Sequence, residues 1–173
     1  MAQSVDVVIV MGSDSDWPVI QKCAAVLDEF AVRYEARVIS AHRSPKACHE
    51  FAAAARDRGV KVIIAMAGMS AALAGAIAAH TTLPVIGVPT SNGALGGLDA
   101  LLSTVQMPPG VPVAAMGLDA AGARNAAIFA VEILSLTDAG FAKKLADHKR
   151  KMADDVEARS QALAEKISRK QGG

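Results

Sequence analysis

Short, uninterrupted apolar runs alternate with helix-length segments through most of this sequence. A continuous apolar run, unlike an alternating one, indicates a strand that other elements cover on both faces. The pattern therefore predicts an α/β fold: a three-layer, doubly wound, parallel five-stranded sheet in flavodoxin-like order. The five runs are Val5 to Met11, Tyr34 to Ile39, Val60 to Ala65, Pro84 to Val88 and Pro112 to Met116.

Helix signals separate these runs. Pro18 suits the first turn of a helix, and Ser44-Pro45 suits the start of a second helix that Gly59 ends after Arg58. Later helices are expected at Ala71 to His80, Leu98 to Val105 and Ala120 to Leu136. The apolar face of the first helix is expected from residues at helical spacing, namely Trp17, Ile20, Ala24, Leu27 and Ala31.

The composition changes after Thr137. Residues 141–173 contain 14 of the 35 charged residues of the chain, together with apolar residues at helical spacing. We expect a long amphipathic helix that either packs on its own sheet or lies on a neighbouring subunit. The prediction is therefore a single catalytic domain over residues 1–138, with residues 139–173 as its helical arm.

The composition also narrows the classes of function. Aromatic residues make up 3% of the chain and the formal net charge is +1, so the aromatic platforms and basic surfaces typical of nucleic-acid binders are missing. No apolar run approaches the roughly 18 residues that span a bilayer, and the first run lacks the features of a signal peptide. With Cys23 and Cys48 expected as free thiols, we expect a soluble cytoplasmic protein that binds a small molecule, with no nucleic acid or membrane partner.

Polar residues follow the first three predicted strands, at the edge where open α/β sheets bind ligands. The first loop, Gly12 to Asp16, offers backbone N–H groups at a helix N-terminus and the hydroxyls of Ser13 and Ser15. These donors suit a phosphate or a sugar oxygen. The Asp16 carboxylate repels phosphate but accepts hydrogen bonds from ribose hydroxyls. Alternatively, Asp16 only caps the first helix.

The second loop, Ser40 to Pro45, combines two functional side chains. Arg43 is a permanent cation whose forked donors match phosphate, and the neighbouring His42 is of the residue type that titrates near neutral pH. His42 is therefore a candidate acid/base, with an ordinary surface histidine as the alternative. Structural or solvated positions are expected for the other histidines, His49, His80 and His148.

The third loop, Ala67 to Ser70, contains Gly68, which would allow the backbone to approach a planar ligand closely. Asp14 and Asp16 in the first loop also suit a magnesium ion, as in a metal-dependent phosphotransfer enzyme. The sequence supplies no obvious third ligand. We therefore expect no metal.

Taken together, Met11-Gly12-Ser13-Asp14-Ser15-Asp16-Trp17 and Ser40-Ala41-His42-Arg43-Ser44-Pro45 resemble the N5-carboxyaminoimidazole ribonucleotide mutase (PurE) family. The similarity continues through Thr82 to Pro89, Ser103 to Val113 and Ala121 to Ala127, and covers nearly the whole chain in order. Several motifs at the right intervals are more specific than any single one.

The resemblance implies that the chain moves a carboxylate from the exocyclic nitrogen to ring carbon four of an aminoimidazole ribonucleotide, without metal or cofactor. It implies that His42 is the acid/base, that Arg43 binds the phosphate, and that the protein is a homo-octamer with the tail helix reaching across subunits. It also implies a larger set of substrate-binding residues: Ser13, Ser15, Asp16, Ser40, Ala41, Ala67, Gly68, Ser70 and Leu73.

The chain departs from the family pattern at two places. Many members have Gly-Gly-Ala-Ala-His-Leu-Pro-Gly where this chain has Met69 to Gly75, so a second histidine is missing at Ala72. A family Gly-Lys pair is replaced by Asp119-Ala120. A related class carboxylates aminoimidazole ribonucleotide directly with carbon dioxide and likewise lacks that histidine. Direct carboxylation therefore remains an alternative, as does a non-catalytic flavodoxin-like module that binds a nucleotide or flavin.

Overall fold

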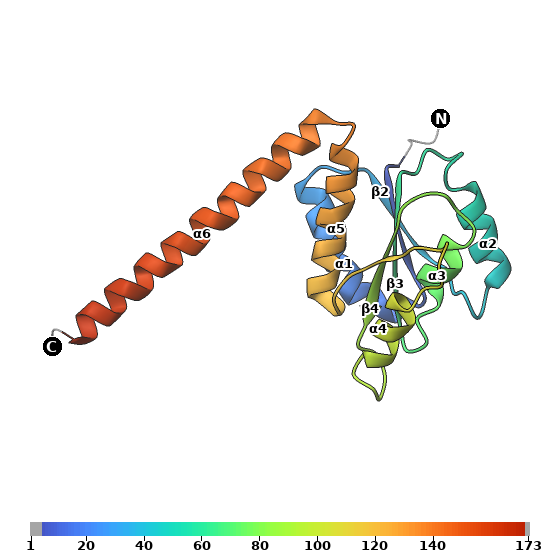
Figure 1. Ribbon diagram of the computed structural model, residues 1–173, viewed down its shortest axis with the longest axis horizontal. Helices are drawn as coiled ribbons and strands as arrows, with labels where there is room; N and C mark the ends of the chain where they lie inside the picture. The colour runs from blue at the N-terminus through green and yellow to red at the C-terminus, as the bar shows by residue number, and fades with distance from the viewer. Residues whose placement is uncertain (1–4, 172–173) are drawn as a thin grey trace. The chain divides into compact units, whose positions relative to one another are not determined.

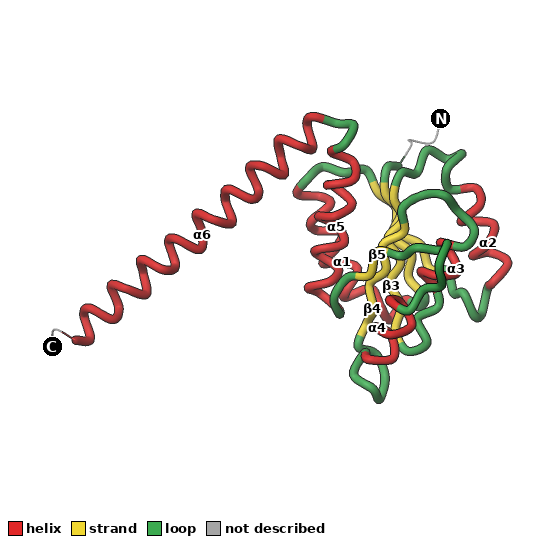
Figure 2. The backbone as a smooth tube through the Cα atoms, in the orientation of Figure 1, coloured by secondary structure: helices red, strands yellow, loops and turns green. Residues whose placement is uncertain are grey.

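The sheet has five parallel strands in the order β2-β1-β3-β4-β5, as the sequence predicts. The computed structural model describes residues 5–171. Figures 1 and 2 show the strands side by side at the centre, between two layers of helices. The strands are β1 (Val7–Met11), β2 (Tyr34–Val38), β3 (Val62–Gly68), β4 (Val85–Thr90) and β5 (Ala114–Ala115).

Helices cover both faces of the sheet, with α1 and α5 on one side and α2, α3 and α4 on the other (Figure 1). The contacts divide the chain after Leu134 into a unit with the sheet and a unit with α6. The predicted boundary after residue 138 stays a prediction, and residues 1–4 and 172–173 of the two predicted ranges lie outside the described residues. The helices are η1 (Asp14–Asp16, a 3₁₀ turn), α1 (Trp17–Glu29), α2 (Pro45–Ala54), α3 (Leu73–Ala78), α4 (Leu98–Val105), α5 (Asp119–Ser135) and α6 (Ala139–Gln171).

A row of isoleucines crosses the middle of the sheet. Ile9 of β1 is in register with Ile64 of β3, which is in register with Ile86 of β4. All three side chains are fully buried, and each contributes about 1.5 to 3 kcal/mol by leaving water. The row explains why continuous apolar runs identified these strands, because both faces of each strand lie under helices.

The predicted ends of several elements were wrong. The run from Pro112 to Met116 forms only the two-residue strand β5, since proline lacks the N–H that a ladder requires. Helix α2 ends at Ala54, four residues before Arg58, and the following turns close at Gly59, whose φ is 84°. Helix α3 is shorter than the predicted Ala71 to His80.

The predicted apolar face of α1 was wrong at both ends. The Trp17 side chain is 45% exposed, and Ala31 lies beyond the helix in a turn with a φ of 57°. Ile20, Ala24 and Leu27 are buried as predicted. The error arises because periodicity detects the middle of a helical face better than its ends, where the chain turns away from the sheet.

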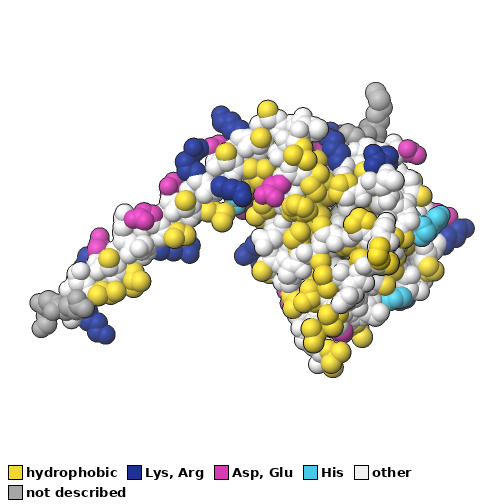
Figure 3. Space-filling view, viewed as in Figure 1, with side chains coloured by type: hydrophobic (Ala, Val, Ile, Leu, Met, Phe, Trp, Pro, Cys, Tyr) yellow, Lys and Arg dark blue, Asp and Glu magenta, His cyan; other side chains and the backbone are white. Residues whose placement is uncertain are grey.

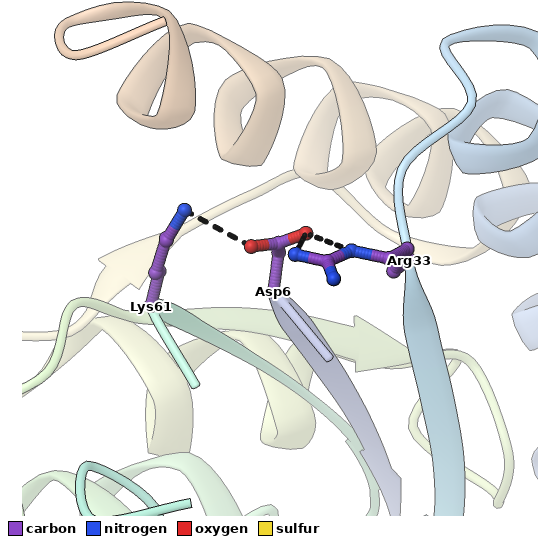
Figure 4. Close-up of polar contacts among 3 residues, drawn as sticks. All are labelled: Asp6, Arg33 and Lys61. Atoms are coloured by element: carbon purple, nitrogen blue, oxygen red, sulfur yellow. Dashed lines mark hydrogen bonds and ion pairs between the residues drawn. The ribbon is translucent and has the colours of Figure 1, made fainter. Parts of the chain in front are cut away.

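One buried carboxylate joins the starts of three strands. The Asp6 side chain, 8% exposed, forms ion pairs of 3.0 Å with both Arg33, just before β2, and Lys61, just before β3. Figure 4 shows the two cations approaching the carboxylate from opposite sides. The Asp6 backbone repeats the connection, since its N–H donates to the Arg33 carbonyl and its carbonyl accepts from the Lys61 N–H. The charged groups therefore fix the alignment of the strands at the edge opposite their carboxyl ends.

We expect Asp6→Asn to lower the free energy of unfolding by about 1 to 3 kcal/mol, because it removes charge-assisted hydrogen bonds from a buried position. Urea unfolding at a fixed protein concentration measures the change. A matched control is Lys46→Met, which removes the exposed Lys46–Glu50 pair and should cost less than about 0.5 kcal/mol. Equal losses for the two variants would contradict a structural role of the Asp6 pairs.

Candidate active site

The loops that follow β1, β2 and β3 surround a pocket of about 510 Å³ at the carboxyl ends of the strands. All eleven residues that the sequence analysis selected line this pocket. They are Ser13, Ser15, Asp16, Ser40, Ala41, His42, Arg43, Ala67, Gly68, Ser70 and Leu73. The structure therefore brings the predicted set together, and the roles of its members stay predictions. The pocket is also lined by Gly12, Met69, Ala72 and Asn92.

The first loop is organised by a hydroxyl group. The Ser13 Oγ accepts a hydrogen bond from the Ser15 N–H at 3.4 Å and donates one to the Asp14 carboxylate at 3.2 Å. These bonds hold residues 14–16 in the 3₁₀ turn η1 that precedes α1. The backbone amides of this turn and the N-terminus of α1 therefore lie at the pocket, where the helix dipole favours an anionic or polar ligand.

Asp16 is the buried carboxylate of the pocket. Asp16 is 3% exposed, and its Oδ1 accepts hydrogen bonds from the Asn92 amide at 2.7 Å and the Thr90 hydroxyl at 3.3 Å. The side chain makes no capping bond to α1, so the capping alternative was wrong. Burial raises the pKa of Asp16 above its ordinary value, while the bonds from Thr90, the Ser13 backbone and Asn92 oppose the rise.

Gly68, the last residue of β3, allows this contact between strands. A Cβ at Gly68 would lie 2.7 Å from the Thr90 hydroxyl and 3.1 Å from the Asn92 Cβ. A larger residue would therefore displace both hydrogen-bond donors of Asp16. Close approach of a ligand is the reason for Gly68 that the sequence suggests, and the structure adds a packing reason within the protein itself.

Arg43 connects the second loop to the first. Its guanidinium donates to the Gly12 carbonyl at 2.8 Å and to the Ser40 hydroxyl at 3.4 Å, and its backbone N–H donates to the same hydroxyl at 3.1 Å. Ser44 begins α2 by position, but its hydroxyl donates to the Ser40 carbonyl and does not cap the helix. The guanidinium is exposed at the pocket and directed by these bonds, which suits the binding of an anion.

His42 lies on the turn between Ser40 and Arg43, exposed at the pocket. Among residues 5–171, none forms a hydrogen bond with its ring, so both ring nitrogens remain available to a ligand. The ring belongs to the same short turn that directs Arg43. An imidazole and a guanidinium therefore line the same cavity.

Sequence reasoning missed Asn92 and Thr90. It considered only the loops after the first three strands, although β4 ends at the same edge as β3, and Thr90 pairs in register with Gly68. Asn92 follows two residues later, so extending the same argument to the fourth loop would have found it. Met69 has a φ of 56° and is 61% exposed, a backbone conformation that the sequence did not indicate.

The described residues contain no group suited to a bound metal ion. Within residues 5–171, three or more His, Cys, Asp or Glu side chains nowhere come together. Asp14, the partner of Asp16 in the magnesium alternative, lies outside the lining of the pocket.

Within residues 5–171, no helix is long and apolar enough to cross a membrane.

Comparison with known families decides the assignment. Residues 6–155 match the model of the AIR carboxylase family. This chain belongs to the AIR carboxylase family. Relatives from Pyrococcus abyssi and Bacillus subtilis, both named N5-carboxyaminoimidazole ribonucleotide mutase, are 55% and 51% identical to it. The alignments cover 83% and 86% of this chain and 82% and 91% of the relatives.

Two solved structures share the fold. A Treponema denticola PurE2 variant superposes with a TM-score of 0.83 at 28% identity, over 91% of this chain and 96% of that one. Treponema denticola PurE gives a TM-score of 0.81 at 28% identity, over 91% and 97%.

The raised pKa of Asp16 predicts a pH-dependent effect on stability. A carboxyl group that holds its proton more tightly in the folded state stabilises the fold at pH values below its ordinary pKa. This contribution is lost as the pH rises through the raised value. We expect the stability of Asp16→Asn, relative to the original chain, to increase as the pH rises above the ordinary pKa of an aspartate, until the raised pKa is passed. Urea unfolding at several pH values measures the difference in the free energy of unfolding, and a difference that shrinks with rising pH would contradict the raised pKa of Asp16.

Proposed function

We propose that this chain is an N5-carboxyaminoimidazole ribonucleotide mutase of de novo purine biosynthesis. It is an isomerase that converts the N5-carboxylated ribonucleotide to 4-carboxy-5-aminoimidazole ribonucleotide. The observation that carries the proposal is the pocket in which His42, Arg43 and Asp16 meet at the carboxyl edge of the sheet. Membership of the family and the names of its relatives support the same reaction.

The pocket divides into parts that match a ribonucleotide. Arg43 and the amides of the first loop suit the phosphate, because both present N–H donors to an anion. Asp16 suits the ribose, because a carboxylate accepts bonds from neighbouring hydroxyls while the Asn92 amide holds it in place. Ser40 and the Ala67 to Leu73 loop are then left to line the base, beside His42.

His42 would act twice in the reaction. The imidazolium protonates the carbamate nitrogen, the bond from nitrogen to the carboxyl carbon breaks, and carbon dioxide is released into the pocket. Ring carbon four then attacks the carbon dioxide, and the neutral imidazole removes the proton from that carbon. The proton lent in the first step returns in the second, so the cycle needs no other reactant. A positioned acid/base typically accelerates such steps about 10² to 10⁴-fold.

We expect His42→Asn to lower turnover by at least about 100-fold, because asparagine keeps the polarity but transfers no proton. Binding of aminoimidazole ribonucleotide, measured by calorimetry, should stay within a few-fold. His49→Asn is the matched control, since His49 lies on α2 and contacts the His80 ring, and it should keep its activity. Turnover of the His42 variant near the original rate would remove His42 from the acid/base role.

One assay separates the proposal from its alternatives. The purified chain is offered either the N5-carboxylated substrate or aminoimidazole ribonucleotide with bicarbonate, and formation of the carbon-carboxylated product is followed. Efficient use of the first substrate supports the mutase, and exclusive use of the second indicates a direct carboxylase. A protein that turns over neither and purifies with flavin or nucleotide is a binding module. Loss of activity with a chelator would indicate the metal-dependent alternative.

We further propose a homo-octamer in which residues 139–173 serve as an arm on a neighbouring subunit. Within the first unit, α4 carries three apolar residues on one face, each about half exposed: Leu98, Leu102 and Val105. Figure 3 shows hydrophobic side chains gathered over this region. Helix α6 exposes a second apolar series: Met152, Val156, Leu163 and Ile167. Apolar surfaces of this kind favour association.

Truncation tests the arm. We expect a chain that ends after Ala139 to form a smaller assembly or to unfold at a lower temperature, because the apolar series of α6 is lost. Sedimentation velocity and thermal unfolding at matched concentration measure both properties. An unchanged oligomer with unchanged stability would rule out the arm.

A further inference from the structure

Asp119 occupies a backbone conformation that side chains rarely adopt. It is the first residue of α5, and its φ is 54°. Aspartate tolerates this left-handed region better than most residues, but glycine would adopt it at no cost. Asp119 therefore carries a conformational penalty that contacts of its carboxylate can offset.

The Asp119 carboxylate binds the backbone of the loop between β4 and α4. Its Oδ1 accepts a hydrogen bond from the Ser91 N–H at 2.8 Å. The far end of the same loop returns to this point, because a Cβ at Gly97 would lie 2.6 Å from the Leu118 side chain and 3.0 Å from the Ser91 Cα. The loop is therefore closed at its base against the residues that begin α5.

Ser91 lies between the two donors that hold Asp16. Thr90 precedes it and Asn92 follows it, and both donate to the same Oδ1 of Asp16. Thr90 is fixed by its place in β4, whereas Asn92 is exposed and lies beyond the end of the strand. The Asn92 amide also donates to the Thr90 hydroxyl at 3.3 Å. The bond from the Ser91 N–H to Asp119 holds the backbone that precedes Asn92.

We propose that Asp119 is a positioning residue: it anchors the Ser91 backbone, so that Asn92 holds the Asp16 carboxylate in the orientation that receives the nucleotide. The chain of contacts runs from the start of α5 through the β4–α4 loop to the pocket. The inference rests on the proposed function only in assigning Asp16 to substrate binding. The connection from Asp119 to Asp16 stands on the hydrogen bonds themselves.

Two substitutions separate the carboxylate from the backbone conformation. Asp119→Gly keeps the positive φ and removes the acceptor, whereas Asp119→Asn keeps an acceptor oxygen and a residue type that tolerates the conformation. The matched control is Asp138→Gly, which removes a similar carboxylate acceptor: Asp138 Oδ1 accepts a 2.8 Å hydrogen bond from the Gly140 N–H at the start of α6. All three are made in the full-length chain.

The first measurements need no substrate. Amide hydrogen exchange at Ser91 and Asn92 should accelerate at least about ten-fold in Asp119→Gly, because the anchoring bond is lost, and should stay near the original rate in Asp119→Asn. Carboxyl NMR should show a higher pKa for Asp16 in Asp119→Gly, because the bond from Asn92 that lowers it is weakened. Asp138→Gly should change neither. Unchanged exchange and an unchanged Asp16 pKa in Asp119→Gly would overturn the proposal.

Kinetics then tests the effect on the nucleotide. Asp119→Gly should raise KM about ten-fold with a smaller change in kcat, because an interaction made equally in the ground and transition states is weakened. Asp119→Asn should restore KM to within about two-fold. An original chain without turnover would contradict the proposed function while the exchange and pKa results still decide the anchoring of Asp16. Normal turnover with an unchanged KM in Asp119→Gly would overturn the positioning role.

Discussion

Strand β1 is hydrogen-bonded on both sides, and the arrangement of the pocket depends on this. Its five residues are almost fully buried and pair in parallel with β2 and β3. Where β1 ends, the Gly12 N–H donates to the Met66 carbonyl and the Met11 carbonyl accepts from the Ile39 N–H. The loops that follow the three strands therefore begin at one level. The connections from β1 to β2 and from β3 to β4 run toward opposite edges of the sheet. The loops therefore separate and leave a crevice.

The pocket combines a costly burial with the contacts that compensate it. An ionised carboxylate is expensive to remove from water, and Asp16 is held in that position by donors from β4 and the loop after it. The approach of those donors in turn requires the missing side chain at Gly68. A site built this way is preorganised, since the carboxylate is oriented before any ligand arrives. The burial of Asp16 costs stability, and in return the carboxylate is held in one orientation at the pocket.

The two ends of the sheet use charge differently. At the amino edge, Asp6 is neutralised by Arg33 and Lys61, and the pairs serve alignment of the strands. At the carboxyl edge, Asp16 has neutral donors, and Arg43 is directed by the Gly12 carbonyl. The first arrangement satisfies its charges within the protein. The second leaves a cation and an acceptor facing a cavity, where they are available to a polar ligand.

Sequence alone determined the strands, their order and the set of loops at the pocket. Buried parallel strands are recognisable because both faces demand apolar residues, and the sheet order then places the loops after β1, β2 and β3 together. The weak points were local. The extent of β5, the end of α2 and the exposure of Trp17 depend on contacts that periodicity does not record.

Only the tertiary structure decided how the pocket is held together. From the sequence, Asp16 was equally well explained as a helix cap or as a residue that binds a ligand. Its carboxylate instead accepts hydrogen bonds from Thr90 and Asn92, more than seventy residues away along the chain, which excluded the cap. In the sequence, Asp119 was only a departure from the family pattern. In the structure, its carboxylate accepts a hydrogen bond from the Ser91 N–H. Such contacts join residues through space, and their energies depend on distances that no local pattern encodes. The sequence therefore determined which groups reach the pocket, and the fold determined which of them hold the others in place.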